Sequence, residues 1–365
     1  MQAVTSNDMR FLFVDLGSAW GGAERYLTWV MDALRARGHW AGCVGPDERF
    51  APHCDRLWLT GSRFKHLGRV RRLVAAIAKA ERVQLVHFNA DRAIHLAPFV
   101  RLPRGVPWSA TKHLTQPTPK SPLDVRTRVE VRLTNFSLAR AALCICVSES
   151  MRGELPPAAR QRAVLVENGV ADPGPPAWDA ARPTRAVFLG RVSPEKGIED
   201  LLALAERAGA RPPQARTWTV AVAGTGPLAG RVADSASRLP AGVLDYLGFQ
   251  ADPGAVYARA GALILPSSHE GMPLVILEAF ARGLPVVAYD IPGVRDVVAH
   301  GRNGLLVRRD DGVDGLERAL DRLFGDEGLR LELGRNARAD YERRHRLDAM
   351  LARTTELLET LASRG

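Results

Sequence analysis

Arg191 and Lys196 lie in a short polar segment that directly follows an apolar run in the second half of the chain. Two cations in one loop of this kind can bind a phosphate or diphosphate group. The chain contains 45 arginines but only five lysines, and Lys196 is the only lysine after residue 120. Because an ammonium group is a compact point charge, its use at this position favours a diphosphate that is approached end-on.

Glu270 and Glu278 lie further along the chain, in the segment 266–279. Pro273 suits the first turn of a helix, so the free N–H groups of a helix N-terminus are expected in the same place. The two carboxylates are too far apart in the sequence to share a proton, and they are expected to accept hydrogen bonds from the hydroxyl groups of an extended polyol. For either glutamate alone, a solvated surface charge is the ordinary alternative. Glu278, however, lies within an apolar run and needs a polar partner.

Two glycine-rich loops add candidate contacts to an anion. Gly21 and Gly22 precede an amphipathic stretch, where backbone N–H groups can approach an anion; a plain turn between a strand and a helix is the alternative. Gly224 and Gly226 follow another apolar run, and with Gly230 they give the spacing G-x-G-x-x-x-G instead of the dinucleotide-binding G-x-G-x-x-G. This loop is therefore expected to form a tight turn under a nucleotide.

An α/β fold is expected to position these loops, because short apolar runs alternate with helix-length amphipathic stretches along the whole chain. Apolar strands separated by helices indicate parallel strands that are covered on both faces, as in doubly wound sheets. The expected strands include 11–14, 85–88, 186–189, 219–222 and 263–265, and the expected helices include 23–37, 67–82, 198–209, 273–282, 312–324 and 346–362.

A stretch rich in proline and glycine at 171–177 interrupts this alternation near the middle of the chain. Prolines at this density cannot continue a helix or a central strand. We therefore expect an N-terminal Rossmann-like domain at 1–170, a second Rossmann-like domain at 171–345 that faces it across a cleft, and a C-terminal helix at 346–365 that returns to the first domain.

Composition excludes several classes of protein. With 46% hydrophobic and 25% charged residues, the 365-residue chain has an ordinary globular composition. No apolar run is long enough to span a membrane, and the first eight residues lack the layout of a signal peptide, so a cytoplasmic protein is expected. The four cysteines form no CxxC pair, and Cys144 and Cys146 are expected to be buried on one face of a strand, with neither a zinc site nor a disulfide indicated.

The net charge of +10 is concentrated in the first half of the chain. Residues 1–170 hold 25 basic and 14 acidic side chains, which gives +11, whereas the remainder gives −1. This excess predicts an anionic partner for the first half, and a solvated surface is the alternative. No recognised motif for binding nucleic acid accompanies the charge, so no nucleic-acid partner is expected.

Two basic stretches are candidates for peripheral contact with the anionic inner face of the cytoplasmic membrane. In the first, around an expected helix at 69–83, apolar residues at helical spacing leave the basic ones off the apolar stripe. The two sets are Arg63, Lys65, Arg69, Arg71, Arg72, Lys79 and Arg82, and further along the chain Arg126, Arg128 and Arg132.

The segment 270–287 closely resembles the family 4 glycosyltransferases, and the resemblance covers nearly the whole chain. Members of this family are retaining enzymes of the GT-B fold that use nucleotide-sugar donors. No single matching segment is specific, but their combination is. The further matching segments are 21–25, 147–150, 167–170, 190–191, 196–197, 224–227, 247–249, 292–294 and 301–307.

The resemblance implies a role for each matching position. Arg191 and Lys196 would hold the donor diphosphate, and Glu278 would bind the ribose hydroxyls. Glu270 would bind hydroxyls of the donor sugar, and His113 would lie beside that sugar, although its flanking residues depart from the usual family pattern. The other donor-binding residues would be Gly21, Gly22, Gly224, Thr225, Gly226, Phe249, Gly271, Met272, Pro273 and Leu274, and the acceptor-binding residues Glu24 and Asn168.

The resemblance also implies a reaction, the transfer of a hexose-type sugar from a UDP- or GDP-sugar to an acceptor hydroxyl with retention of configuration. The chain contains no D-x-D motif, so the charges of Arg191 and Lys196 and helix N-termini are expected to stabilise the leaving diphosphate without a metal or other cofactor. No carboxylate is evident as a glycosidase-like nucleophile. We adopt front-face attack, in which the leaving phosphate takes the acceptor proton, as the hypothesis.

The acceptor is expected to be a glycan, a lipid-linked saccharide or a small molecule. The basic first half favours a cell-envelope glycan, such as lipopolysaccharide, capsule or a lipid-linked saccharide. The alternatives are glycosylation of a small soluble metabolite and a nucleotide-sugar epimerase of the same fold. The glycine spacing at 224–230 argues against a nicotinamide-dependent dehydrogenase.

Overall fold

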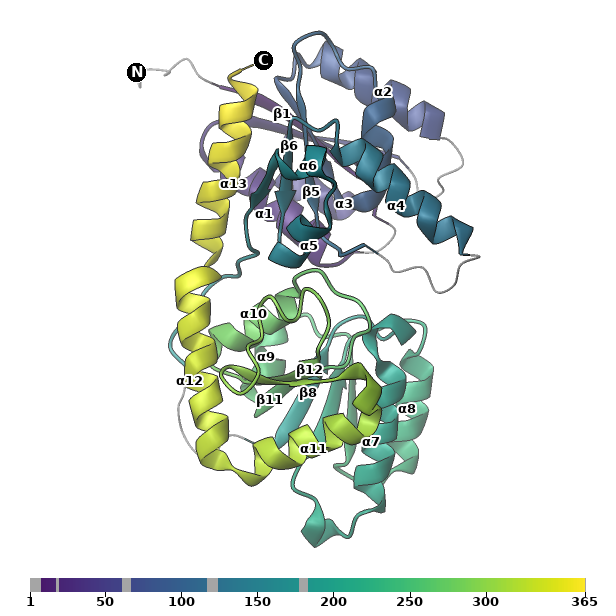
Figure 1. Cartoon of the computed structure of the whole chain (residues 1–365), viewed down its shortest axis with the longest axis vertical. Coiled ribbons are helices and arrows are strands. Elements are labelled where there is room, and N and C mark those ends of the chain that lie inside the picture. The colour runs from purple at the N-terminus through teal and green to yellow at the C-terminus, as the bar shows by residue number, and fades with distance from the viewer. Residues whose placement is uncertain (1–7, 18–19, 61–66, 117–123, 177–182, 365) are drawn as a thin grey trace. The chain divides into compact units, whose positions relative to one another are not determined.

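The computed structural model describes residues 8–17, 20–60, 67–116, 124–176 and 183–364. The chain forms two compact units (Figure 1). The N-terminal unit comprises residues 1–168 together with 348–365, and the C-terminal unit comprises residues 169–347.

The N-terminal unit contains a seven-stranded sheet with the order β3-β2-β1-β4-β5-β6-β7, in which all neighbouring strands are parallel. The central strands are buried along almost their whole length because helices cover both faces, which explains their near-continuous apolar sequences. The strands are β1 (Arg10–Asp15), β2 (Trp40–Gly45), β3 (Arg56–Leu59), β4 (Leu85–Asn89), β5 (Trp108–Lys112), β6 (Leu143–Cys146) and β7 (Ala163–Leu165). The helices that connect them are α1 (Gly22–Ala36), α2 (Leu67–Ala80), α3 (Ala90–Leu96), α4 (Val125–Leu138), α5 (Glu149–Glu154) and α6 (Pro157–Arg160).

The last helix of the chain, α13 (Leu347–Ala362), packs within the N-terminal unit. The hydroxyl groups of Thr354 and Tyr26 lie 3.5 Å apart. Glu359 accepts hydrogen bonds from the guanidinium of Arg37 at 2.6 and 2.9 Å and lies 2.9 Å from Nε2 of His39. These contacts tie α13 to α1 and to the start of β2.

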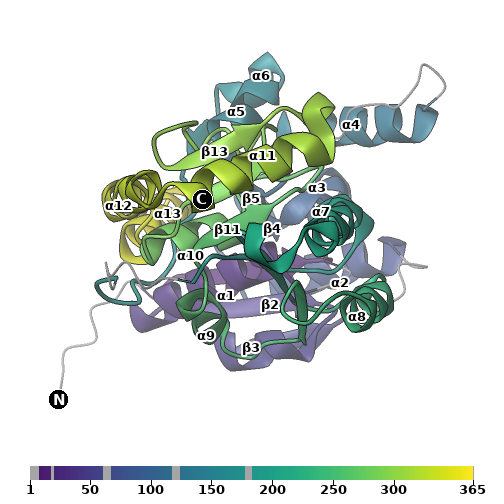
Figure 2. The same ribbon diagram turned by 90° about the horizontal axis from the view of Figure 1, so that it is seen from below.

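The C-terminal unit contains a six-stranded parallel sheet with the order β10-β9-β8-β11-β12-β13. Helices α7 and α8 cover one face of this sheet, and α9 and α10 cover the other (Figure 2). The strands are β8 (Arg185–Leu189), β9 (Thr219–Ala223), β10 (Leu244–Gly248), β11 (Ala262–Leu265), β12 (Val286–Tyr289) and β13 (Gly304–Val307). The helices are α7 (Ile198–Ala210), α8 (Ala229–Arg238), α9 (Pro253–Ala258), α10 (Leu274–Ala281), α11 (Gly312–Gly325) and α12 (Glu327–Arg344).

The two stretches of chain that leave the C-terminal unit run side by side. Val170 donates its N–H to the carbonyl of His345 at 3.0 Å and accepts the N–H of Leu347 at 3.1 Å. Asp172, within the proline-rich stretch, binds the guanidinium of Arg338 on α12 at 2.8 Å. The two units divide between residues 168 and 169 and again between residues 347 and 348. From the proline-rich stretch, we predicted the first division after residue 170.

The expected α/β alternation and parallel sheets are confirmed, because the predicted strands and helices all occur with their ends shifted by at most a few residues. All four cysteines, each within the described ranges, are buried free thiols, and the sulfur atoms of Cys144 and Cys146 lie 3.9 Å apart on one face of β6. In the part of the chain that the structure describes, none of the helices has the length and apolar character needed to cross a membrane.

Candidate active site

The loops after β8 and β9 pack directly against each other in the C-terminal unit. The N–H of Gly190 donates to the carbonyl of Ala223 at 3.0 Å, and the N–H of Val192 donates to the carbonyl of Thr225 at 2.9 Å. Gly224 has a φ of +135°, and a Cβ atom at this position would overlap the carbonyl oxygen of Gly190. The glycines of this loop therefore permit a close approach of the two backbones, which agrees with the tight turn expected from the sequence.

Lys196 and Glu270 form an ion pair across two loops of the C-terminal unit. The Nζ atom of Lys196 lies 2.6 Å from Oε1 of Glu270, whose side chain is only 6% exposed. The contact depends on Gly197, where φ is +74° and a Cβ atom would overlap the carbonyl of Pro266. Two residues that the sequence assigned to different parts of a ligand are thus in direct contact. Arg191, by contrast, is exposed.

Glu278 lies on α10 and has the buried polar partner that its apolar surroundings predicted. Glu278 is only 6% exposed, and its Oε2 atom accepts a hydrogen bond from the hydroxyl of Tyr257 on α9 at 3.0 Å. The helix begins at Leu274, with Pro273 as the residue before its first turn. Met272 and Leu274 are buried, so the loop before α10 is held by apolar packing.

Two further features border these loops. Gly293 has a φ of +81°, and a Cβ atom there would overlap the carbonyl of Gly271, so the loop after β12 packs closely on the loop before α10. Phe249 follows β10 and is 75% exposed, which leaves a large aromatic face open to solvent.

The N-terminal unit holds its candidate residues in a buried network at the carboxyl ends of β1, β4 and β5. Asn89 and Asp15 are register partners at the ends of their strands, and Nδ2 of Asn89 donates to Oδ2 of Asp15 at 2.7 Å. The same Nδ2 donates to the carbonyl of Ala23 at 3.1 Å, and Nε2 of His113 lies 2.8 Å from Oδ1 of Asn89. Asp15 and Asn89 were not among the site residues predicted from the sequence, although each is a polar residue that ends an apolar run.

This network determines the tautomer of His113. The carbonyl of Ala23 can only accept, so the amide nitrogen of Asn89 must face it and the amide oxygen must face His113. Nε2 of His113 therefore carries the proton, and Nδ1 is the acceptor. Burial, followed by the charges of His87 and Lys112, lowers the pKa of His113 to about 3, so the ring is neutral at physiological pH.

Glu24 closes the loop that contains Gly21 and Gly22. Its Oε2 atom accepts the N–H of Gly21 at 2.8 Å, which satisfies one of the free donors at the start of α1. Burial, followed by the charge of Asp15, raises the pKa of Glu24 to about 7. Gly21 and Gly22 are exposed, whereas Asn168 is buried at the end of the first stretch of the N-terminal unit. Within the described ranges, no three His, Cys, Asp or Glu side chains are grouped to hold a metal ion.

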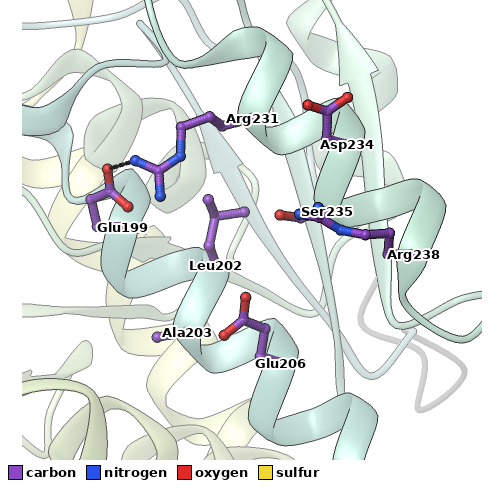
Figure 3. Close-up of a pocket in the computed structure, with 8 residues that line it drawn as sticks. All are labelled: Glu199, Leu202, Ala203, Glu206, Arg231, Asp234, Ser235 and Arg238. Carbon is purple, nitrogen blue, oxygen red and sulfur yellow. Dashed lines mark hydrogen bonds and ion pairs between the residues drawn. The ribbon is translucent and has the colours of Figure 1, made fainter.

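A groove of about 470 Å³ lies between α7 and α8, apart from the residues discussed above (Figure 3). Glu199 and Arg231 form an ion pair at one end, and Leu202 and Ala203 line its floor. The groove also contains Glu206, Asp234, Ser235 and Arg238. None of the sequence-predicted site residues lines it.

The two units with parallel sheets have the Rossmann-like architecture of the GT-B glycosyltransferases. Residues 20–172 match the family described as Glycosyltransferase Family 4, and residues 179–340 match the family described as Glycosyl transferases group 1. The chain belongs to the family 4 glycosyltransferases, which confirms the resemblance seen in the sequence.

The chain is also similar to individual proteins, among them a glycosyltransferase that it matches along most of its length. The 2-deoxystreptamine N-acetyl-D-glucosaminyltransferase of Streptomyces fradiae is 31% identical over 305 residues, which cover 73% of this chain and 68% of the relative. An exopolysaccharide phosphotransferase of Streptomyces coelicolor is 35% identical over 181 residues, but the match covers 49% of this chain and only 19% of that protein. The crystal structure of Anabaena HepE in complex with UDP and glucose has the same fold, with a TM-score of 0.77, 23% identity and coverage of 96% of this chain and 100% of HepE.

Proposed function

We propose that this glycosyltransferase moves a hexose-type sugar from a UDP- or GDP-sugar to an acceptor hydroxyl. The observation that carries the proposal is the Lys196–Glu270 ion pair beside the loop that leads into α10, with Glu278 further along the same helix. An ammonium group suits a diphosphate, and buried carboxylates suit sugar and ribose hydroxyls. The relative HepE binds UDP and glucose, which agrees with a donor of this class.

In the proposed donor site, Lys196 exchanges its contact with Glu270 for the diphosphate when the donor binds. Arg191 is exposed and free to move to the same diphosphate, while Glu278, held by Tyr257, accepts hydrogen bonds from the ribose. Phe249 offers an aromatic face on which the nucleobase can stack. Gly224, Thr225 and Gly226 form the turn beneath the nucleotide.

The proposed reaction retains the anomeric configuration. The acceptor oxygen attacks the anomeric carbon from the face that the diphosphate leaves, the carbon–phosphate oxygen bond breaks, and the leaving phosphate oxygen takes the acceptor proton. Arg191 and Lys196 neutralise the charge that develops on the diphosphate, so we propose that no divalent metal is needed. In the N-terminal unit, Nδ1 of His113 accepts a hydrogen bond from a substrate hydroxyl, and the N–H of Gly22, next to the Gly21 N–H that Glu24 accepts, approaches an anionic group of a substrate.

For the acceptor, we propose a cell-envelope glycan or lipid-linked saccharide, because the excess positive charge lies in the first half of the chain. A small soluble acceptor is the second candidate. It is supported by the Streptomyces fradiae relative, whose name gives 2-deoxystreptamine as its acceptor.

The test is a donor screen with UDP- and GDP-sugars. We expect one donor to raise the unfolding temperature and to release its nucleoside diphosphate in the presence of an acceptor extract, with or without EDTA. NMR coupling constants of the product then report the anomeric configuration. An inverted product would contradict the retaining mechanism, and loss of turnover in EDTA that manganese or magnesium restores would contradict metal independence. Interconversion of UDP-N-acetylglucosamine with its epimer in the absence of an acceptor would replace the proposal with an epimerase.

A further inference from the structure

Helix α4 exposes three of its apolar side chains and buries two small polar ones, Thr134 and Ser137. Val125 is 64% exposed, Val129 is 55% exposed and Phe136 is 41% exposed. At 3.6 residues per turn these three residues fall within about 40° of one another around the helix axis. An ordinary surface helix places its apolar stripe toward the core, whereas α4 exposes this stripe and buries only Leu138 among its apolar residues.

Polar contacts fix this orientation of α4. Thr134 is buried, donates its hydroxyl to the carbonyl of Glu130 at 3.0 Å and accepts from Nε2 of His95 on α3 at 2.6 Å. At the next residue, Nε2 of Gln116 donates to Oδ1 of Asn135 at 2.7 Å. A rotation of α4 that buried its apolar face would break these part-buried hydrogen bonds, so the exposed stripe is a stable feature of the fold.

A neighbouring aromatic residue extends the apolar stripe into a larger surface. The ring of Phe99 stacks on Phe136 with centroids 6.3 Å apart, and Phe99 is itself 46% exposed. We call this set the α4 surface: Val125, Val129, Phe136 and Phe99.

Arginines surround the α4 surface. Arg126, Arg128, Arg132 and Arg140 are all exposed, and Glu130 is the only acidic residue of the helix. The guanidinium of Arg140 lies 3.5 Å from the centroid of the Phe136 ring, so charge and apolar area are in direct contact. In Figures 1 and 2 the N-terminal end of α4 extends away from the sheet of its unit.

We propose that the α4 surface docks the N-terminal unit onto an anionic lipid bilayer. An exposed helix face with an apolar centre and flanking arginines can insert its apolar groups at the level of the lipid headgroups while the guanidinium groups bind lipid phosphates. A second copy of the chain fits less well. In a two-fold dimer the α4 surface of one copy would face the α4 surface of the other. The four arginines of each copy would then repel one another, and Glu130 is the only acidic residue of α4 that could offset this charge.

Helix α2, the first basic stretch singled out in the sequence, does not have this character. Its Val74 and Ile77 are buried against the sheet while Arg69, Arg71 and Arg72 are exposed. Arg63 and Lys65 lie outside the described residues. In its described residues, 68–80, helix α2 therefore exposes charge without exposing a large apolar side chain, and it serves as the matched control for α4.

The link to catalysis rests on the proposed function. Because Gln116, three residues after His113, is hydrogen-bonded to Asn135 of α4, docking through the α4 surface would bring the membrane close to the segment that carries His113, as a lipid-linked acceptor requires. Membrane binding is measured without donor or acceptor, so its failure would leave the proposed transfer reaction untouched, and the failure of transfer would leave membrane binding untouched.

The experiment is co-sedimentation of the full chain with vesicles of phosphatidylcholine, with or without 30% phosphatidylglycerol (about a physiological anionic fraction), at low and high salt. We expect binding to the anionic vesicles only, weakened by salt. Arg128→Ser with Arg132→Ser should weaken it roughly 30-fold, the effect of losing two surface charges. Val129→Ser with Phe136→Ser should weaken it about tenfold or more, because apolar insertion is lost. The control, Arg69→Ser with Arg71→Ser and Arg72→Ser, should change it by less than about threefold.

Thermal unfolding checks that each variant folds, and light scattering after gel filtration reports the oligomeric state. Absence of binding by the wild-type chain would overturn the proposal. Equal losses for the α2 and α4 arginine variants, with no loss for Val129→Ser with Phe136→Ser, would replace α4 docking with general charge attraction. A wild-type dimer that becomes a monomer in the Val129→Ser with Phe136→Ser variant would assign the surface to a second copy instead.

Discussion

The two units build their candidate sites in different ways. In the C-terminal unit, the residues come mainly from two short segments, 190–197 and 266–278, which close backbone packing at Gly197 brings together. In the N-terminal unit, they come from the ends of separate strands, and a chain of hydrogen bonds from Asp15 through Asn89 to His113 joins them. The first arrangement places charged side chains in loops that lead into helices, whereas the second holds a neutral ring in a defined orientation.

The difference suggests a division of labour. The C-terminal unit presents an ammonium, an exposed guanidinium and two carboxylates, which suit the charged and hydroxylated parts of a nucleotide sugar. The N-terminal unit presents a neutral hydrogen-bond acceptor at His113 and a basic outer surface. If the division is correct, changes in the C-terminal unit should act on donor binding and on the leaving group, and changes in the N-terminal unit should act on turnover, stability or docking.

The largest effect is expected for Lys196→Ala. Loss of one charge that stabilises the leaving diphosphate should lower kcat by about 100-fold or more, measured as release of nucleoside diphosphate from the preferred donor. Lys196→Arg should restore little of it, because a planar fork does not replace a point charge. Arg231→Ala is the matched control, since it removes an exposed arginine that pairs with Glu199 in the same unit and should leave turnover unchanged. Wild-type kcat for Lys196→Ala would exclude Lys196 from the diphosphate site.

The contrast between the units also determines what the sequence could predict. The alternation of strands and helices, the two parallel sheets and the contiguous segment that contains Glu270 and Glu278 were all readable, because each depends on local pattern. The contact between Lys196 and Glu270 was not, because it depends on the packing of two loops 74 residues apart in sequence. Asp15 and Asn89 were missed because their pairing requires the register of β1 with β4.

The orientation of α4 was also beyond sequence reasoning. Its arginines were recognised as a basic stretch, but its valines and Phe136 would ordinarily be assigned to the core. The deciding contacts are the hydrogen bonds of Thr134 and Asn135 with His95 and Gln116, which come from other elements of the N-terminal unit. Hydrophobic pattern alone cannot weigh such contacts against apolar burial.

The second prediction concerns stability of the N-terminal unit. Because the pKa of Glu24 is raised to about 7, the native carboxyl keeps its proton between about pH 4.5 and 7 while the unfolded chain releases it. Glu24 therefore makes the protein less stable as pH rises through this range. The variant Glu24→Gln cannot titrate, but its amide oxygen can still accept the N–H of Gly21. From pH 5 to pH 7, the free energy of unfolding of the wild type should therefore fall by about 2 kcal/mol relative to that of the variant.

Chemical denaturation at several pH values measures this difference. Burial lowers the pKa of His87 and of His113 to about 3, so these residues make stability rise with pH up to about 6.5. They act equally in both proteins and cancel in the comparison. Parallel curves for Glu24→Gln and the wild type would show that Glu24 does not titrate near neutral pH.

The third prediction separates the two carboxylates of the C-terminal unit. Glu278→Gln should weaken the binding of free UDP or GDP about tenfold by calorimetry, because a hydrogen bond from the ribose to a charged group is lost. Glu270→Gln should leave this affinity unchanged or raise it, because Lys196 loses its competing partner. Tyr257→Phe, which removes the donor that orients Glu278, should fall between the two. Equal losses for both glutamate variants would refute the separation.

The smallest effect on turnover is expected for Asn89→Leu, which keeps the number of side-chain heavy atoms but removes the hydrogen bonds of Asn89 to His113, Asp15 and the carbonyl of Ala23. Loss of the hydrogen bond that orients the ring should lower kcat by roughly 3- to 10-fold, and thermal unfolding checks that the loss of the other two leaves the protein folded. Affinity for UDP should not change, because Asn89 belongs to the unit that does not hold the donor nucleotide in the proposed function. The ring should also lose its fixed tautomer, which nitrogen NMR of His113 reports as a shift from the Nε2–H form to a mixture. A pure Nε2–H tautomer with unchanged kcat would mean that Asn89 supports only the fold, whereas a matched fall in UDP affinity would mean that the two units do not divide the work as proposed.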